Sequence, residues 1–94
     1  MEIDLTKTYA CGQPVCTLED ATLTFFYKNG QKKAEGPFVD GMMEGTWRFY
    51  RYDGALWQIG NFKNEQKHGR WTRYDRDGNI EYDAEFSEGK KVKK

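Results

Sequence analysis

The chain has 94 residues, which is enough for one domain. Fifteen Lys and Arg balance fifteen Asp and Glu, and a net charge of zero excludes the overall electrostatics of a dedicated nucleic-acid binder. A hydrophobic fraction of 37% and a mean hydropathy of −0.97 exclude a transmembrane helix. Three Trp, six Tyr and six Phe nevertheless argue against a disordered chain.

Residues 1–21 form an N-terminal segment that lacks the repeat found in the rest of the chain, and we interpret it as a cap or a degenerate half-repeat. Its start has neither a basic region nor an apolar stretch, so we expect no signal peptide and a cytoplasmic location. Residues 5–10 are a candidate capping strand, because a solenoid needs an atypical unit at its ends.

Two cysteines lie in this segment, Cys11 and Cys16, with four residues between them. A structural zinc site needs about four ligands, and the chain adds only one histidine, His68, to the two thiols. A redox pair usually has about two intervening residues. We favour two ordinary thiols in a turn over a local disulfide or a shared metal site, and we expect no metal and no cofactor.

From residue 22 onward the sequence repeats with a period of 24 residues, in the units 22–45, 46–69 and 70–93. Six columns of this repeat agree. They are Leu23, Trp47 and Trp71; Phe26, Tyr50 and Tyr74; Asn29, Asp53 and Asp77; Gly30, Gly54 and Gly78; Gly36, Gly60 and Ala84; and Phe38, Phe62 and Phe86.

Asn-Gly or Asp-Gly between aromatic-rich runs predicts a tight hairpin turn with positive φ at both central positions. The predicted strand pairs are 22–28 with 31–38, 46–52 with 55–62, and 70–76 with 79–86, joined by loops at 39–45 and 63–69. No stretch has the apolar spacing of a helix. The sequence therefore predicts an all-β protein, an open single-layer antiparallel β-meander of three hairpins with an N-terminal capping strand.

Alternation along the strands predicts which side chains share a face of this sheet. In the second hairpin, Trp47 and Phe49 are expected to share one face. The other face is expected to carry Arg48, Tyr50 and Tyr52. On the return strand, Leu56 is expected to share a face with Gln58. The column of small residues predicts slots over which a ring from a neighbouring strand can lie; these residues are Gly36, Gly60 and Ala84.

The spacing Gly-x-Trp-x-x-Tyr-x-x-x-Gly occurs from Gly45 to Gly54 and again from Gly69 to Gly78. This pattern resembles the MORN repeat (membrane occupation and recognition nexus), specifically the bacterial variant with Asn/Asp-Gly turns, over about 22–93. The resemblance implies an elongated, twisted sheet that serves as a scaffold or interaction module. Membrane or phosphoinositide association is proposed for some such proteins, and some bacterial ones are described as antitoxins or immunity partners.

We expect no enzymatic activity and no catalytic residues. His68 is interpreted as a structural turn residue, because no nucleophile lies at a suggestive spacing. The carboxylates of the last repeat are interpreted as a solvated face, because a single-layer sheet lacks the cleft that would separate their pKa values. No glycine-rich phosphate-binding loop is present.

Arg and Tyr residues are the best candidates for binding a partner, because both are enriched in interface hot spots. The candidates are Arg48, Tyr50, Tyr52, Arg70, Tyr74 and Arg76. They are expected to share strand faces, Arg48 with Tyr50 and Tyr52, and Arg70 with Tyr74 and Arg76. Packing is the alternative role for the two tyrosines in a repeat column, Tyr50 and Tyr74.

We therefore predict a protein–protein interaction module, antitoxin-like or immunity-like, that binds a partner protein or a second copy through its open face or edge. A membrane or phosphoinositide recognition module and a structural scaffold are the alternatives. Membrane contact is disfavoured because acids dilute the basic residues in every repeat, and only residues 90–94 form a basic cluster. We interpret that cluster as a device against edge pairing, and we expect no nucleic-acid partner.

Overall fold

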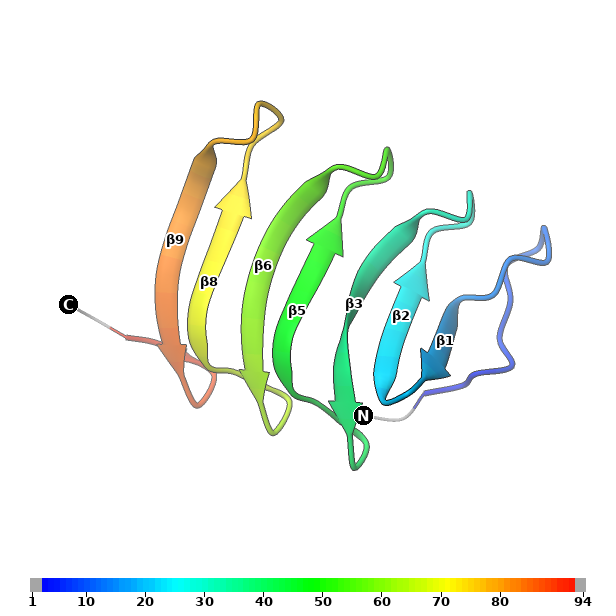
Figure 1. Cartoon of the computed structure of the whole chain (residues 1–94), viewed down its shortest axis with the longest axis horizontal. Helices are drawn as coiled ribbons and strands as arrows, with labels where there is room; N and C mark the ends of the chain where they lie inside the picture. Colours follow the sequence, from blue (N-terminus) through cyan, green and yellow to red (C-terminus); the bar gives the residue numbers. More distant parts are fainter. Residues whose placement is uncertain (1–2, 93–94) are drawn as a thin grey trace.

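The computed structural model describes residues 3–92 as one open antiparallel sheet in a single layer (Figure 1). Its strands follow the order β1-β2-β3-β5-β6-β8-β9-β10, with β4 paired to β3 and β7 paired to β6. The expected all-β meander is confirmed. The strands are β1 (Cys16–Glu19), β2 (Thr22–Phe26), β3 (Lys32–Val39), β4 (Met42–Met43), β5 (Gly45–Tyr50), β6 (Leu56–Lys63), β7 (Gln66–Lys67), β8 (Gly69–Tyr74), β9 (Ile80–Ser87) and β10 (Lys90–Lys91).

The turns at the Asn-Gly and Asp-Gly pairs are longer than the sequence predicts. The N–H of Tyr27 donates to the carbonyl of Gln31 at 2.9 Å, and of this turn only Gly30 has positive φ, at 89°. The prediction of positive φ at both central positions is therefore wrong. The Asn29 side chain accepts a hydrogen bond from the N–H of Gln31 at 3.0 Å, which holds a type I turn that the glycine then closes.

The tight two-residue turns lie instead at the opposite ends of the strands. Both residues have positive φ at Asp40 and Gly41, with 52° and 78°. The same holds at 20–21, 64–65 and 88–89. Turns of this kind match the twist of the strands that they join. The segments predicted as loops, 39–45 and 63–69, are thus small hairpins whose return strands are β4 and β7.

The capping strand predicted over residues 5–10 is wrong in position. The strand that pairs with β2 is β1, in a register that sets Cys16 opposite Phe25. The two-residue turn of Asp20 and Ala21 joins β1 directly to β2. The strand β1 is therefore the edge strand beside β2. Within residues 5–10 only an isolated bridge forms, between Thr8 and Pro14.

Each long hairpin carries a β-bulge near its tip. In the second hairpin Phe49 pairs with Gln58, whereas Tyr50 pairs with Leu56, so Trp57 is the extra residue. Neighbours on a strand point to opposite faces. Leu56 therefore lies on the face opposite to Gln58, and the expectation that the two share a face is wrong because the bulge shifts the register.

The core lies on one side of the sheet, which we call the ring face. Trp47 is fully buried and Trp71 is 4% exposed. Cys16, Leu23 and Ala34 complete the buried core around Trp47. The residues packed against this cluster are Ile3, Phe25, Phe38, Met43, Phe49 and Phe62. The opposite side, which we call the polar face, carries one row across six strands: Thr24, Glu35, Arg48, Ile59, Thr72 and Asp83.

Candidate interaction surface

The two buried indoles fill the slots that the small-residue column predicts. A Cβ on Gly36 would come within 2.3 Å of the Trp47 ring, and a Cβ on Gly60 would come equally close to the Trp71 ring. The predicted slots are confirmed at both glycines. Each indole also donates its Nε1–H to a backbone carbonyl, at 2.9 Å to Pro37 for Trp47 and at 2.8 Å for Trp71. These rings are therefore part of the core rather than displayed.

Cations lie over aromatic rings at the C-terminal half of the ring face. The Nζ of Lys67 lies 4.8 Å from the ring centroid of Trp71 and 5.0 Å from that of Phe86. The guanidinium carbon of Arg73 lies 5.1 Å from the ring centroid of Trp57. Such contacts stabilise the charge while shielding the rings from water. The sequence analysis missed them, because Lys67 reaches the rings only through the register of the short strand β7.

Charges of both signs are paired on the polar face. The guanidinium of Arg70 on β8 makes a two-point ion pair with the carboxylate of Asp83 on β9, with its Nε 2.9 Å from Oδ1. Hydrogen bonding to Asp83, followed by its charge, raises the pKa of Arg70. This candidate residue is thus held in place, although its side chain stays exposed to solvent.

Tyr50 joins two repeats on the same face. Its hydroxyl donates to the carboxylate of Glu35 at 3.3 Å, and the side chain is half-buried. Burial, followed by the negative charge of Glu35, raises the pKa of the Tyr50 phenol. Arg48 lies opposite Glu35 in the register and is exposed, so a basic side chain, an acidic one and a phenol meet at this point.

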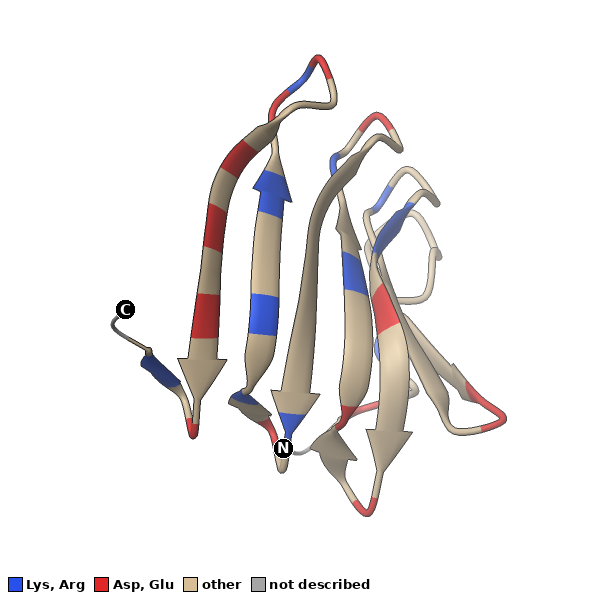
Figure 2. Ribbon diagram, turned by 60° about the vertical axis from the view of Figure 1, so that its left-hand side comes forward, with Lys and Arg blue, Asp and Glu red and all other residues tan. Residues whose placement is uncertain are grey.

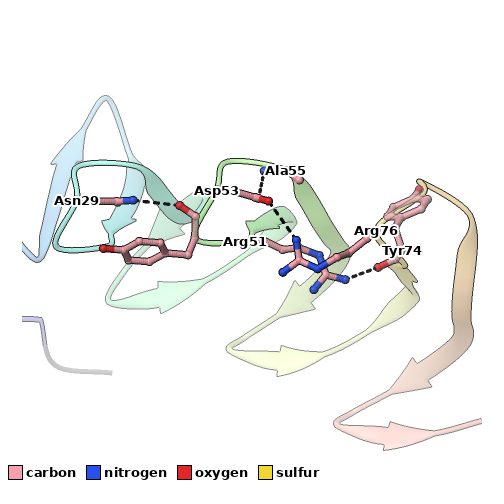
Figure 3. Close-up of polar contacts among 7 residues, drawn as sticks. Asn29, Arg51, Asp53, Ala55, Tyr74 and Arg76 are labelled. Atoms are coloured by element: carbon pink, nitrogen blue, oxygen red, sulfur yellow. Dashed lines mark hydrogen bonds and ion pairs between the residues drawn. The ribbon is translucent and has the colours of Figure 1, made fainter.

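The hairpin tips are joined by side chains that reach from one repeat to the next. The hydroxyl of Tyr27 donates to the carbonyl of Tyr50 at 2.8 Å. One repeat later, the guanidinium of Arg51 donates to the carbonyl of Tyr74 at 3.0 Å (Figure 3). Contacts that recur at the same column fix the spacing between neighbouring hairpins.

Two further contacts complete this row of tips. Asn29 donates its amide to the carbonyl of Tyr52 at 3.1 Å, and Arg76 makes an ion pair with Asp53 at 3.1 Å (Figure 3). The Asp53 carboxylate also accepts from the N–H of Ala55 at 3.0 Å. This backbone bond, followed by Arg76, lowers the pKa of Asp53.

The six candidate residues fall into two groups. Four of them lie on the polar face of β5 and β8: Arg48, Tyr50, Arg70 and Tyr74. The other two lie in the hairpin tips, Tyr52 and Arg76, both exposed. The expectation that each set shares one strand face is wrong, because β5 ends at Tyr50 and β8 ends at Tyr74. The sequence analysis also missed Tyr27 and Arg51, which share a repeat column with Asp75.

Acidic residues recur along one strand at the C-terminal side of the sheet (Figure 2). Glu81, Asp83 and Glu85 alternate along β9. Of the two arginines of β8, Arg70 lies opposite Glu85 and forms its ion pair with Asp83, whereas Arg73 lies opposite Tyr82. A net charge of zero therefore conceals strands of opposite charge.

Both cysteines are free thiols, Cys11 exposed and Cys16 buried. Burial raises the pKa of Cys16, which keeps this thiol protonated and unreactive. No group of three His, Cys, Asp or Glu side chains among residues 3–92 could hold a metal ion.

His68 is half-buried and donates its backbone N–H to the carbonyl of Asn61 at 2.9 Å.

A hollow of 450 Å³ lies between the first two hairpin tips. It is open to solvent and lined by Phe26, Gly30, Gln31, Lys32, Tyr50 and Gly54.

Within the described part of the chain there is no helix long and apolar enough to cross a membrane.

A family model described as MORN repeat variant matches the chain in three consecutive units, residues 19–40, 43–64 and 67–88. These units have the same period as the repeats identified above, and each begins three residues earlier. Comparison with curated proteins and comparison with solved structures found no match.

Proposed function

Because this chain belongs to the MORN repeat variant family, we propose that it is a non-catalytic protein–protein interaction module. One observation carries the proposal: the polar face interleaves acids and bases with tyrosines, as at Glu35, Arg48 and Tyr50. An anionic membrane attracts clusters of one sign, whereas a protein surface can offer a matching pattern of both signs. Arg and Tyr are also the side chains that most often supply binding energy at protein interfaces.

Side-chain contacts within and between the hairpins support the proposal physically. Arg70 is held by Asp83, and the main chain of Tyr50 and Tyr74 is held by Tyr27 and Arg51. A surface whose side chains are already ordered loses less conformational entropy when it binds.

The experiment compares a protein partner with a lipid surface. Cross-linking and affinity purification from the native host is run beside sedimentation with vesicles of phosphatidylserine and phosphatidylcholine at physiological salt. We expect a protein partner whose recovery falls with Arg48→Glu and stays unchanged with Lys28→Ala, an exposed control in the first hairpin tip. Sedimentation with the vesicles, with no protein recovered, would favour the membrane alternative.

The finer form of the proposal is an antitoxin or immunity role, supported by the resemblance of bacterial variant-type repeats to such proteins. Co-expression with the product of the neighbouring gene tests it. Rescue of growth from a toxic neighbour by the wild-type chain, and loss of rescue with Arg48→Glu, is the expected result. A neighbour that is harmless when expressed alone would refute the antitoxin role and leave the broader proposal standing.

A further inference from the structure

Charge is distributed unequally between the two faces of the sheet. Side chains alternate between the faces along a strand, and residues that pair across strands share a face. Among residues 3–92, every charged side chain at a paired position of the ring face is positive. These side chains all lie in the C-terminal half of the ring face, which we define as β6 to β10: Lys67, Arg73 and Lys91.

Aromatic rings, and not carboxylates, lie beside these three cations. The ion pairs formed among residues 3–92 include none of the three. The Nζ of Lys91 and the guanidinium carbon of Arg73 lie 5.4 and 5.5 Å from the ring centroid of Tyr82. Arg73 also donates to the side-chain oxygen of Gln58, a neutral acceptor, at 3.3 Å. A ring stabilises a cation but leaves N–H donors available for an anion.

The rings beside the cations are only partly shielded from water. Trp71, under Lys67, is 4% exposed, whereas Tyr82 is 36% exposed. Phe62 and Phe86 are half-buried. Because the apolar face of a sheet is buried against a second layer in stable folds, these rings form a surface that a further chain segment can cover.

The N-terminal half of the ring face, β1 to β5, is covered by a segment of the chain itself. Ile3 packs against the buried cluster that contains Cys16 and Trp47. The thiol of Cys16, which lies on this face, donates to the carbonyl of Asp4 at 3.8 Å. The carboxylate of Asp4 accepts from the N–H and hydroxyl of Thr6. A segment with an aliphatic residue beside an acidic one therefore already lies on the uncharged half of this face.

We propose that the C-terminal half of the ring face binds an acidic, aliphatic segment of a partner protein, with aliphatic side chains on the half-buried rings and carboxylates at Lys67, Arg73 and Lys91. This inference rests on the proposed function. It adds a second contact surface, on the side of the sheet opposite to Arg48, and specifies the chemistry of the segment that fits there.

Two other occupants fit this half of the face less well. A symmetric dimer through the same patch would set cations against cations and provide no carboxylate. An anionic lipid surface carries its charge over its whole area, and it attracts clusters of Lys and Arg. The cations of the ring face are instead confined to one half, which suits a segment whose acidic residues are themselves confined.

The test uses capped synthetic hexapeptides and the 94-residue chain labelled for NMR. The probe is LEIDLE, which contains the sequence of residues 2–5, and the controls are the neutral LQINLQ and the basic LKIKLK. We expect LEIDLE to bind about tenfold more tightly than LQINLQ, which corresponds to about 1.4 kcal/mol, and LKIKLK to bind more weakly still. The indole N–H signal of Trp71 should shift more than that of Trp47.

Pairs of neighbouring lysines on opposite faces locate the interaction. Lys67→Gln should weaken binding of LEIDLE about threefold, as expected for the loss of one exposed ion pair. Lys63→Gln, in the same short hairpin but on the polar face, should leave the affinity unchanged. Lys91→Gln and Lys90→Gln make the same comparison on β10, and they carry the test should Lys67→Gln not fold.

Equal binding of LEIDLE and LQINLQ, or equal losses from the two variants of a pair, would overturn the inference. An absence of peptide binding would also overturn it. In that case, sedimentation with phosphatidylserine vesicles that is lost in Lys67→Glu would identify a lipid surface as the occupant, and a dimer that is lost in Lys67→Glu would identify a second copy.

The proposed function fails separately. A native partner that the wild type and Lys67→Glu recover equally well, but that Arg48→Glu does not recover, would refute the ring-face site alone. Recovery of no partner by any of these chains would refute the interaction module.

Discussion

The indole of Trp71 lies directly over Gly60 on the neighbouring strand, so close that no side chain at residue 60 could coexist with it. The ring is fixed by its hydrogen bond to the carbonyl of Asn61 and by an edge-on contact with Phe62, at 5.0 Å between centroids. A sheet of one layer builds its core in this way, by laying rings across its own backbone.

We predict that Gly60→Ala destabilises the protein by about 1–3 kcal/mol, the usual cost of overpacking a core. The added methyl group would lie 2.3 Å from Trp71, so the ring or the strand must move. Denaturant unfolding measures the change. The matched control is Ala84→Gly, which we expect to cost about 0.5–1 kcal/mol for a glycine within a strand. Equal losses for both variants would contradict the slot.

Truncation of the same indole tests whether it is core. We expect Trp71→Ala to lower the free energy of unfolding by about 3–5 kcal/mol. Trp71→Phe keeps an aromatic ring but removes the hydrogen bond to Asn61, so it should cost less. A loss under about 1 kcal/mol for the alanine variant would mean that the ring is displayed for a ligand.

The turn between β1 and β2 provides a stabilising substitution. Ala21 has a φ of 62° and is exposed, and this conformation costs an ordinary residue about 1–2 kcal/mol. Ala21→Gly should therefore stabilise the protein by about 0.5–1 kcal/mol after the entropy of glycine is subtracted. Thermal unfolding measures the gain. Gly41→Ala, at the second position of the next two-residue turn, should destabilise the protein, and a stabilising effect there would refute the explanation.

The contact between Arg51 and Tyr74 predicts a difference between two arginines of the hairpin tips. Arg51→Ala should destabilise by about 1–3 kcal/mol, because it removes a partly buried, charged donor and leaves the carbonyl of Tyr74 unpaired. Arg76→Ala, which removes only an exposed ion pair with Asp53, should cost about 0–1 kcal/mol. The two free energies of unfolding, measured in the same buffer, decide the point; the reverse order would disprove the coupling between repeats.

Tyr50 predicts how stability changes at alkaline pH. Its pKa is raised by burial and then by Glu35, so the folded state holds the phenolic proton more tightly than the unfolded state. The resulting stability is fully present below the unfolded pKa of about 10 and is lost as the pH rises through the folded pKa. The free energy of unfolding should fall less steeply above about pH 10 in Tyr50→Phe than in the wild type. Parallel pH profiles would contradict a raised pKa.

The parts of the fold that could be predicted are those that one repeat encodes by itself. The columns of Trp47 and Gly60 recur at a fixed period, and a small residue beside a large ring has one simple packing solution. The turn types could not be predicted from Asn29 and Gly30, because the loop length depends on a side-chain bond to Gln31. The strand β1 was missed because the turn that follows it contains Ala21, whereas the next turn of the same kind contains Gly41.

The surface was less predictable than the core. Arg48 and Tyr50 were placed correctly on one face, but Tyr52 was not. Because β5 ends at Tyr50, the alternation of side chains along a strand does not determine the direction of Tyr52. Contacts such as that from Arg51 to Tyr74 join residues in different repeats. Their identification requires the distance between hairpins, which depends on the register of the assembled sheet.

The order of the strands affects how the chain reaches its native state. Each strand pairs only with strands close to it in sequence, so no long loop has to close before the first hydrogen bonds form. An all-β protein of this size would ordinarily fold slowly, since its pairings are distant along the chain. Here folding can begin in any one hairpin and spread to the hairpins beside it. Stability is then the sum of the contributions of single repeats and of the contacts between neighbouring repeats.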